Sequence, residues 1–258
     1  MPATATPLRI VQITDLHLKA EAGSLLWGAD VDAGLNAVLA HVRRRNPAPD
    51  FVLATGDLVG DEPHAYYRLR GLLETLEVPV YCLPGNHDFP AAMAQALRGG
   101  RVRRERYLAS GNWQIVLLDS SVPGSPVGHL ARGELGLLDT ALATRPDLHT
   151  LVCLHHNPLS FGTAWLDTMT VTNGEALFAI LERYPKVRAV VCGHIHGEYA
   201  GWREAIQLLA TPATSVQFKP NTPDPQVDNL PPGYRWFELY PDGTLRTGVE
   251  RVGRAVKS

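Results

Sequence analysis

The sequence contains five short apolar runs that read as buried strands, and each run is followed at once by a polar fragment. Stretches with helical periodicity lie between most of the runs, and such alternation predicts a sheet with parallel strands. Polar side chains just past the carboxyl ends of such strands meet at one edge, where ligands bind in open α/β sheets. We therefore expect the fragments to converge on one site. They are Asp15-Leu16-His17, Gly56-Asp57, Gly85-Asn86-His87-Asp88, His155-His156 and Gly193-His194-Ile195-His196.

The apolar pattern also predicts the order of the elements. Strands are expected at residues 8–13, 51–54, 78–83, 113–118, 151–154 and 189–192, and helices at 31–42, 63–76, 90–97, 132–143 and 173–184. Beyond His196 the pattern changes to short strands alone, at residues 198–202, 206–210, 214–218, 234–240 and 245–252. We expect an α/β protein with one domain over residues 1–258, in which residues 197–258 form a C-terminal β meander packed on the same domain.

The composition limits the classes of partner. The chain has 258 residues, of which 45% are hydrophobic, enough for a sizeable core. Its formal net charge of −2 gives no general attraction to nucleic acid or to anionic membranes. The arginine-rich stretch at residues 98–106 has no series of aromatic residues to stack bases, so we interpret it as a solvated loop rather than a nucleic-acid site.

No segment of the sequence predicts export or membrane insertion. Residues 1–7 lack the basic and apolar regions of a secretory signal, and no stretch approaches the roughly 20 apolar residues of a membrane span. A cytoplasmic location is therefore expected. The cysteines lie in apolar runs without a C-x-x-C pair, which predicts buried reduced thiols at Cys82, Cys153 and Cys192.

Several side chains of the polar fragments are of the types that bind metal ions. Two carboxylates, one amide and four imidazoles are too many for one tetrahedral zinc ion and suit two ions that share a bridging carboxylate. Nitrogen and oxygen ligands without a thiolate favour Fe, Mn, Zn or Co over Mg or Ca. We therefore expect two divalent metal ions per chain. The candidate ligands are Asp15, His17, Asp57, Asn86, His155, His194 and His196.

The ordered set D-x-H, G-D, G-N-H-D, H-H and G-H-x-H resembles the motifs of the calcineurin-like metallophosphoesterases over residues 10–196. The resemblance implies a four-layer αββα sandwich of two mixed β-sheets flanked by helices, with a dinuclear metal centre. It also implies the ligands: Asp15, His17 and His196 for one ion, Asn86, His155 and His194 for the other, and Asp57 as the bridge.

The same resemblance implies roles in substrate binding and catalysis. His87 would contact the substrate phosphate without binding metal, and His87 and Asp57 are the candidate catalytic residues. The candidate substrate-binding residues are His17, Asp57, Asn86, His87 and His196.

The chemistry of these residue types agrees with that assignment. Two ions about 3.5–4 Å apart lower the pKa of a bridging water, and the resulting hydroxide attacks phosphorus in line with the leaving oxygen. His87 could stabilise charge on a phosphoryl oxygen or protonate the leaving alkoxide, with Asp88 a candidate to hold its tautomer.

The remaining histidines are less informative. For His156, a supporting role behind the metals, a role in substrate binding and plain packing stay open. His64, His129 and His149 are expected at the surface.

Segments outside the metal motifs point to the substrate. Residues 25–30, 211–220 and 232–236 are similar to the corresponding segments of bacterial class III 3′,5′-cyclic-AMP phosphodiesterases. This resemblance implies an enzyme that hydrolyses 3′,5′-cyclic AMP to 5′-AMP. A glycerophosphodiester or 2′,3′-cyclic nucleotide phosphodiesterase with the same metal centre is the alternative. A metal-poor binding scaffold is a third reading, but such a scaffold should have lost ligands, and this chain retains them all.

The proline-rich segment 211–234 is a poor helix or central strand, so we expect an extended surface loop beside the metal cleft. There Phe218 could stack on a base and Gln217 or Asn221 could offer hydrogen bonds. Packing of Phe218 into the core of the meander is the alternative. The expected partner is a small-molecule phosphodiester, with no nucleic acid and no membrane, and a homodimer is left open.

Overall fold

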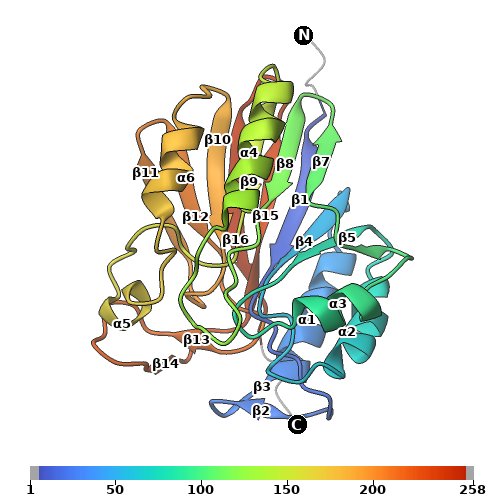
Figure 1. Cartoon of the computed structure of the whole chain (residues 1–258). Helices are drawn as coiled ribbons and strands as arrows, with labels where there is room; N and C mark the ends of the chain where they lie inside the picture. The colour runs from blue at the N-terminus through green and yellow to red at the C-terminus, as the bar shows by residue number, and fades with distance from the viewer. Residues whose placement is uncertain (1–5, 254–258) are drawn as a thin grey trace.

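The computed structural model describes residues 6–253, and within them two six-stranded β-sheets stack face to face (Figure 1). Helices cover the outer face of each sheet, while apolar side chains from both sheets fill the space between them. The layers are therefore helix, sheet, sheet and helix. The predicted αββα sandwich of two mixed sheets is confirmed.

The first sheet carries three of the five polar fragments. Its order is β16 (Leu245–Arg251), β15 (Gly233–Leu239), β1 (Leu8–Ile13), β4 (Phe51–Thr55), β5 (Val80–Leu83) and β6 (Val102–Arg103). The strands β1, β4, β5 and β6 run parallel, whereas β15 is antiparallel to both β1 and β16. On its outer face pack α1 (Val31–Arg43), α2 (Ala65–Glu74) and α3 (Pro90–Ala96).

The second sheet carries the other two fragments. Its order is β11 (Tyr199–Arg203), β12 (Ile206–Ala210), β10 (Val187–Cys192), β9 (His149–Cys153), β8 (Trp113–Leu117) and β7 (Tyr107–Ser110). Only the edge strands β7 and β11 are antiparallel to their neighbours. Its outer face is covered by α4 (Arg132–Thr144) and α6 (Gly174–Leu181).

Three small elements lie apart from the two sheets. They are the hairpin of β2 (Leu25–Leu26) with β3 (Ala29–Asp30), the short helix α5 (Ala164–Asp167), and the pair of β13 (Gln217–Phe218) with β14 (Val227–Asp228).

Most positions of the central strands are apolar because both of their faces are buried. Side chains alternate between the faces of a strand. On β4, Phe51 and Leu53 point into the core between the sheets, while Val52 and Ala54 point into the core beneath the helices. This arrangement explains why the sequence shows continuous apolar runs instead of an alternating pattern.

The expected C-terminal meander is wrong in its strand pairing. The strands β11 and β12 extend the second sheet beside β10, whereas β15 and β16 extend the first sheet beside β1. The described part of this segment, residues 197–253, therefore contributes to both sheets. The apolar pattern of a strand fixes which faces are buried but not which distant strand it pairs with. Within the expected strand 214–218, only Gln217–Phe218 is extended and paired.

Two expectations from composition can be compared with the structure. Cys82, Cys153 and Cys192 are buried and free, and burial raises the pKa of each thiol, which keeps it protonated. Within residues 6–253, no helix combines the length and the apolar character that a bilayer crossing requires.

A buried polar network joins the two sheets directly beneath the polar fragments. The Gln12 amide nitrogen of β1 donates to Thr55 Oγ1 of β4 at 2.8 Å and to the Cys192 carbonyl of β10 at 3.1 Å. The Gln12 amide oxygen accepts from the Thr211 hydroxyl. One fully buried side chain therefore connects strands of both sheets at their carboxyl ends.

We predict that Gln12→Leu lowers the free energy of unfolding by about 2 kcal/mol, because the buried Thr211 hydroxyl loses its acceptor and the Thr55 hydroxyl and the Cys192 carbonyl each lose one hydrogen bond. Urea denaturation measures the change. Gln95→Leu, at an exposed position of α3, is the control and should change stability by less than about 0.5 kcal/mol. Equal stabilities of the two variants would contradict a structural role for the network.

Candidate metal centre

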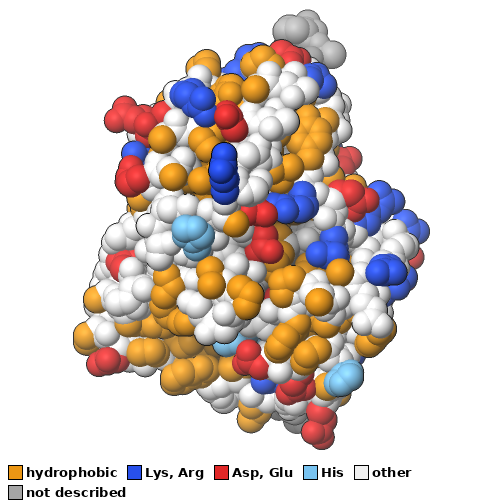
Figure 2. Space-filling model, in the orientation of Figure 1, with side chains coloured by type: hydrophobic (Ala, Val, Ile, Leu, Met, Phe, Trp, Pro, Cys, Tyr) orange, Lys and Arg blue, Asp and Glu red, His pale blue; other side chains and the backbone are white. Residues whose placement is uncertain are grey.

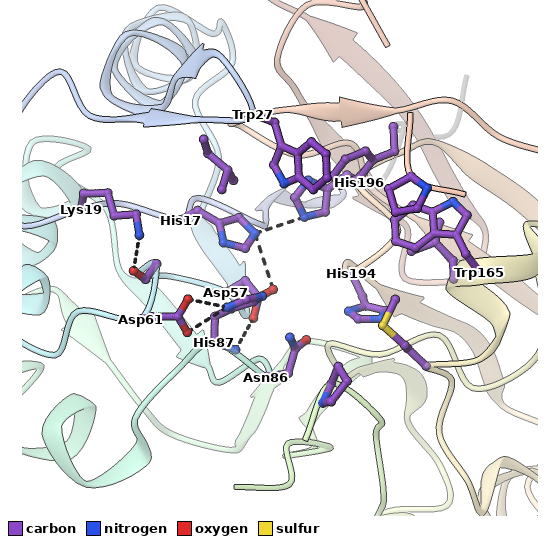
Figure 3. A pocket seen from close by; sticks show the side chains of 17 residues that line it. His17, Lys19, Trp27, Asp57, Asp61, Asn86, His87, Trp165, His194 and His196 are labelled. Atoms are coloured by element: carbon purple, nitrogen blue, oxygen red, sulfur yellow. Dashed lines mark hydrogen bonds and ion pairs between the residues drawn. The ribbon is translucent and has the colours of Figure 1, made fainter. Parts of the chain in front are cut away.

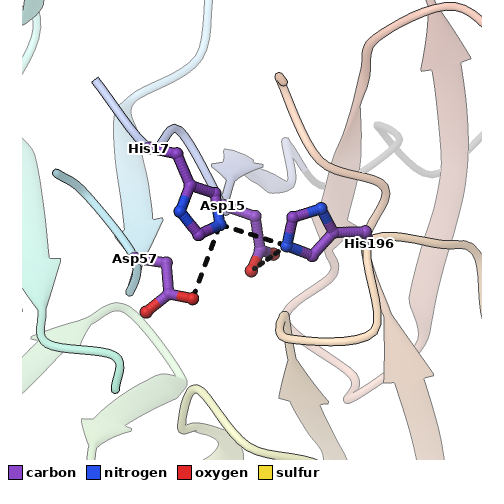
Figure 4. Close-up of side chains that lie close together, drawn as sticks. All are labelled: Asp15, His17, Asp57 and His196. Carbon is purple, nitrogen blue, oxygen red and sulfur yellow. Dashed lines mark hydrogen bonds and ion pairs between the residues drawn. The ribbon is translucent and has the colours of Figure 1, made fainter. Parts of the chain in front are cut away.

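The polar fragments meet at the carboxyl ends of β1, β4, β5, β9 and β10 (Figures 3 and 4). The backbone pairing of the strands continues into them: Asp15 N donates to the Gly56 carbonyl at 3.1 Å, and His17 N donates to the Asp57 carbonyl at 2.9 Å. The His194 N–H donates to the Asp15 carboxylate and so ties the second sheet to the first. The convergence expected from the strand pattern is present in the structure.

One group of ligand-type side chains comprises Asp15, His17, Asp57 and His196, all buried (Figure 4). The Nε2 atoms of His17 and His196 are 3.1 Å apart, and His17 Nε2 lies 3.6 Å from Asp57 Oδ2. His196 Nε2 lies 3.4 Å from Asp15 Oδ1. These ligand atoms all lie within 4.8 Å of one another, close enough to surround a single cation.

A second group comprises Asp57, His155 and His194, again with ligand atoms within 4.8 Å of one another. His155 Nε2 lies 3.3 Å from Asp57 Oδ2. The side chains of Asn86 and His194 line one cavity of the protein (Figure 3). Asp57 belongs to both groups, so its carboxylate lies where the two groups meet.

Several of these atoms are buried without a hydrogen-bond partner among the described residues. They include His194 Nε2 and Asn86 Oδ1. A buried polar atom without a partner costs roughly 1–3 kcal/mol, so a protein rarely tolerates such atoms in one place unless something else binds them. Imidazole nitrogen and amide oxygen are both metal ligands, and the donor set therefore fits divalent cations.

In two of the candidate imidazole ligands, the ring nitrogen that faces away from the centre is hydrogen-bonded to a backbone carbonyl. His196 Nδ1 donates to the Val216 carbonyl at 2.8 Å, and His155 Nδ1 donates to the Thr55 carbonyl at 2.9 Å. Because a carbonyl only accepts hydrogen bonds, each Nδ1 carries a proton, and the Nε2 atom of each ring faces the centre. This is the usual support of a metal-binding histidine.

The protonation of the site suits cation binding as well. Burial holds the pKa of His17 and that of His194 well below the usual value, so both rings are neutral and keep a free lone pair. Burial alone would raise the pKa of Asp57, but the charge of the neighbouring His155 and its hydrogen bond hold this pKa well below the usual range. Asp57 is therefore an anion at neutral pH.

The backbone at these residues is held in an uncommon conformation. Five of the ten non-glycine residues with positive φ are candidate ligands: Asp15, His17, Asp57, His194 and His196, with φ from 47° to 66°. Side-chain-bearing residues adopt this region at an energetic cost, and such residues cluster at functional sites. At Gly85 a side chain is excluded outright, since a Cβ there would overlap the Asp57 carboxylate.

His87 lies at the wall of the cavity and is oriented by a residue that the sequence reasoning missed. Its Nδ1 lies 3.0 and 3.1 Å from the two carboxylate oxygens of Asp61 (Figure 3). Its backbone N–H donates to Asp57 Oδ1 at 2.9 Å. A carboxylate only accepts hydrogen bonds, so the Nδ1 atom of His87 carries a proton and donates it in a hydrogen bond to Asp61. The Nε2 atom of the ring takes no part in this contact. The only sequence signal for Asp61 was its position four residues after Asp57.

The expected role of Asp88 is wrong. Its buried carboxylate accepts hydrogen bonds from the Gly85 N–H at 2.8 Å, the Leu58 N–H at 3.0 Å and the Tyr66 hydroxyl at 2.7 Å. Asp88 therefore clamps the loop after β5 to the loop after β4 and does not contact the ring of His87. Asn86 and His87 form a turn that the Asp88 N–H closes on the Gly85 carbonyl at 3.3 Å, and the Asp88 side chain leaves this turn toward the protein interior.

The remaining histidines divide between core and surface. His156 is buried, with its Nδ1 2.8 Å from Ser120 Oγ and its ring 4.7 Å from that of His194, so it packs behind the candidate ligands. His64 and His129 are exposed, as expected. The expectation for His149 is wrong: this residue is buried against Trp113, where the turn at Gly243 approaches its ring.

A cavity of about 290 Å³ opens above the candidate ligands (Figure 3). His17, Asp57, Asn86, His194 and His196 form its floor and His87 part of its wall. Its volume is at the lower end of the range for sites that bind small molecules. The structure therefore places the polar cluster within reach of a small ligand.

Comparison with known proteins agrees with this geometry. The sequence profile of the calcineurin-like phosphoesterases matches residues 8–198, which include all five polar fragments. A 3′,5′-cyclic adenosine monophosphate phosphodiesterase of Pseudomonas aeruginosa is 41% identical over 99% of this chain and 94% of its own. A 3′,5′-cyclic-nucleotide phosphodiesterase of a Nostoc species is 39% identical over 95% of this chain and 93% of its own.

Solved structures share the fold at lower sequence identity. A dimetal phosphatase from Danio rerio superposes with a TM-score of 0.66 over 96% of this chain and 97% of its own, at 16% identity. The matched profile and the buried cluster of His and Asp side chains together indicate that the protein binds divalent metal ions. The chain belongs to the calcineurin-like phosphoesterase family.

Proposed function

We propose that the protein hydrolyses 3′,5′-cyclic AMP to 5′-AMP, as one domain over residues 1–258 and in the cytoplasm. The observation that carries this proposal is the convergence of all seven candidate ligands, six of them buried, beneath a small cavity. Its support on the substrate side is the 41% identity to a cyclic-AMP phosphodiesterase over 99% of the chain. A binding scaffold without activity would have no need to keep this full set of ligand-type side chains.

The seven side chains would hold two ions, with Fe, Mn, Zn and Co as the candidates. The first ion would be bound by Asp15, His17 and His196. The second would be bound by Asn86, His155 and His194, and Asp57 would bridge the two. When bound, such ions neutralise charge on a phosphoryl group and lower the pKa of a water molecule.

The remaining steps belong to the residues of this chain. Asn86, His17 and His196 line the floor of the cavity and would contact the phosphoryl group of the substrate. With Asn86 Oδ1 on a metal ion, the amide nitrogen of Asn86 would donate to a phosphoryl oxygen. His87 would donate a proton from Nε2 to the 3′ oxygen as its bond to phosphorus breaks. The Asp61 carboxylate, hydrogen-bonded to Nδ1, orients the ring for this transfer and stabilises the protonated ring that donates the proton.

The identity of the product tests the proposed function. With the metal-loaded enzyme, we expect 5′-AMP from 3′,5′-cyclic AMP, measured by chromatography against standards, because the 3′ oxygen is the leaving group. Formation of 3′-AMP would mean that the 5′ oxygen leaves instead. Turnover of glycerophosphodiesters or 2′,3′-cyclic nucleotides with no turnover of 3′,5′-cyclic AMP would refute the proposed substrate.

We predict that His87→Ala keeps the metal content and lowers kcat by about 10²–10⁴-fold, the usual effect of a lost general acid or oxyanion donor. Asp61→Asn should lower kcat by about tenfold with little change in KM, since it disturbs only the orientation of the ring.

The double variant separates positioning from an independent effect. If Asp61 acts only through His87, the double variant should be no slower than His87→Ala alone. If the fold losses in kcat of the two single variants multiply in the double variant, Asp61 acts independently of His87. Loss of metal in His87→Ala would show that the imidazole is itself a ligand.

A further inference from the structure

The cavity above the metal centre has two unlike halves. Its floor consists of the His, Asp and Asn side chains described above. Much of the opposite wall is apolar and comes from three separate segments: the β2–β3 hairpin, the region of α5, and β13. The principal apolar residues there are Leu26, Trp27, Trp165, Leu166, Met169 and Phe218.

Three aromatic rings of this wall hold one another in place. The Phe218 ring lies 5.8 Å from that of Trp27 and 5.2 Å from that of Trp165, at interplanar angles of 90° and 87°. These are edge-to-face contacts, which fix ring orientation. The Phe218 ring also lies 4.9 Å from that of His196. The aromatic wall therefore begins directly beside a candidate metal ligand.

The position of Phe218 decides between the two expectations from the sequence. Phe218 is only partly buried and lies at the cavity, outside the three cores of the molecule. Trp27, at the tip of the β2–β3 hairpin, is 59% exposed. Figure 2 shows hydrophobic side chains gathered over the lower part of the molecule, where α5 and β14 lie in Figure 1. An exposed tryptophan at the rim of a polar catalytic cavity is better explained by a ligand than by packing.

Hydrogen-bonding side chains are scarce on this half of the cavity. Gln217 is buried and its amide bonds the Ala213 carbonyl and Arg251, so it does not face the ligand as the sequence reasoning suggested. Asn221 does not line the cavity either. The Lys19 ammonium, at the rim, donates to the Gly60 carbonyl at 2.6 Å. The wall offers flat apolar surface with little to recognise the edge of a base.

We infer that Trp27, Trp165 and Phe218 form a subsite for the nucleobase of the substrate, which holds the base by stacking and apolar contact. The inference rests on the proposed function, since it assigns the part of the substrate that lies beyond the phosphate. Stacking distinguishes poorly between bases, because every base has an aromatic face. The subsite therefore binds adenine and guanine with similar affinity and favours a nucleotide over a phosphodiester without a ring.

The test compares two inhibitors that differ only in the base. Hydrolysis of bis(p-nitrophenyl) phosphate by the metal-loaded enzyme is inhibited with 5′-AMP and with ribose 5-phosphate, and the ratio of their Ki values reports the contribution of the base. In the wild type, 5′-AMP should bind about 10- to 100-fold more tightly. Trp27→Ala and Trp165→Ala should each reduce this ratio by roughly fivefold or more, with unchanged metal content.

Trp202→Ala is the matched control, because Trp202 is 67% exposed on the edge strand β11 and does not line the cavity. Its ratio should equal that of the wild type. A wild-type ratio near one, or a ratio that survives both cavity substitutions, would overturn the subsite. A preference for 5′-AMP over 5′-GMP greater than about tenfold would overturn recognition by stacking alone. If the enzyme leaves 3′,5′-cyclic AMP intact but shows the expected ratios, the proposed function fails and the subsite stands.

Discussion

The structure depends on placing two carboxylates and four imidazoles side by side in a region from which water is largely excluded. Burial of ionisable groups is costly unless each has a partner of suitable charge or hydrogen-bonding character. Here Asp15 and Asp57 are fully or almost fully buried, and His194 Nε2 has no hydrogen-bond partner in the described part of the chain. Divalent cations satisfy both kinds of group at once. Binding of metal is therefore expected to stabilise the fold as well as to supply the chemistry.

The sandwich is built to hold this cluster at the point where both sheets end. Each sheet supplies ligand-type side chains from the carboxyl ends of its own strands, and the Gln12 amide joins the sheets immediately below. The positive φ values of Asp57 and His194 show that the backbone turns sharply at the ends of the strands. Rigid strands on both sides offset this local strain and keep the ligand atoms in place.

The sequence predicted the features that depend on local pattern. Buried strands are continuous apolar runs, and the polar fragments at their ends could be placed because parallel strands end at one edge of a sheet. Features that depend on distant contacts were not predictable in this way. The pairing of β15 with β1, on which the meander prediction failed, involves residues more than 200 positions apart. His149 is buried by a turn that comes from Gly243.

The polar environment of His87 shows the same limit at the level of single side chains. Asp88 is adjacent in sequence but turns into the protein to accept backbone hydrogen bonds, while Asp61 reaches the imidazole from another loop. Likewise, Trp27, Trp165 and Phe218 belong to three short segments whose positions are set by the two sheets and not by their own sequence. The edge-to-face contacts of these rings, with interplanar angles of 87° and 90°, form only when the fold brings the three segments together.

We propose that Asp57 bridges two metal ions held by side chains from both sheets. Anomalous diffraction from crystals of the metal-loaded protein can locate these ions. If Asp57 is the bridge, two anomalous peaks should lie about 3.5–4 Å apart on either side of its carboxylate. One of them should be bound by Asp15, His17 and His196, and the other by Asn86, His155 and His194. A single peak at full occupancy, or two peaks that Asp57 does not contact, would contradict this arrangement.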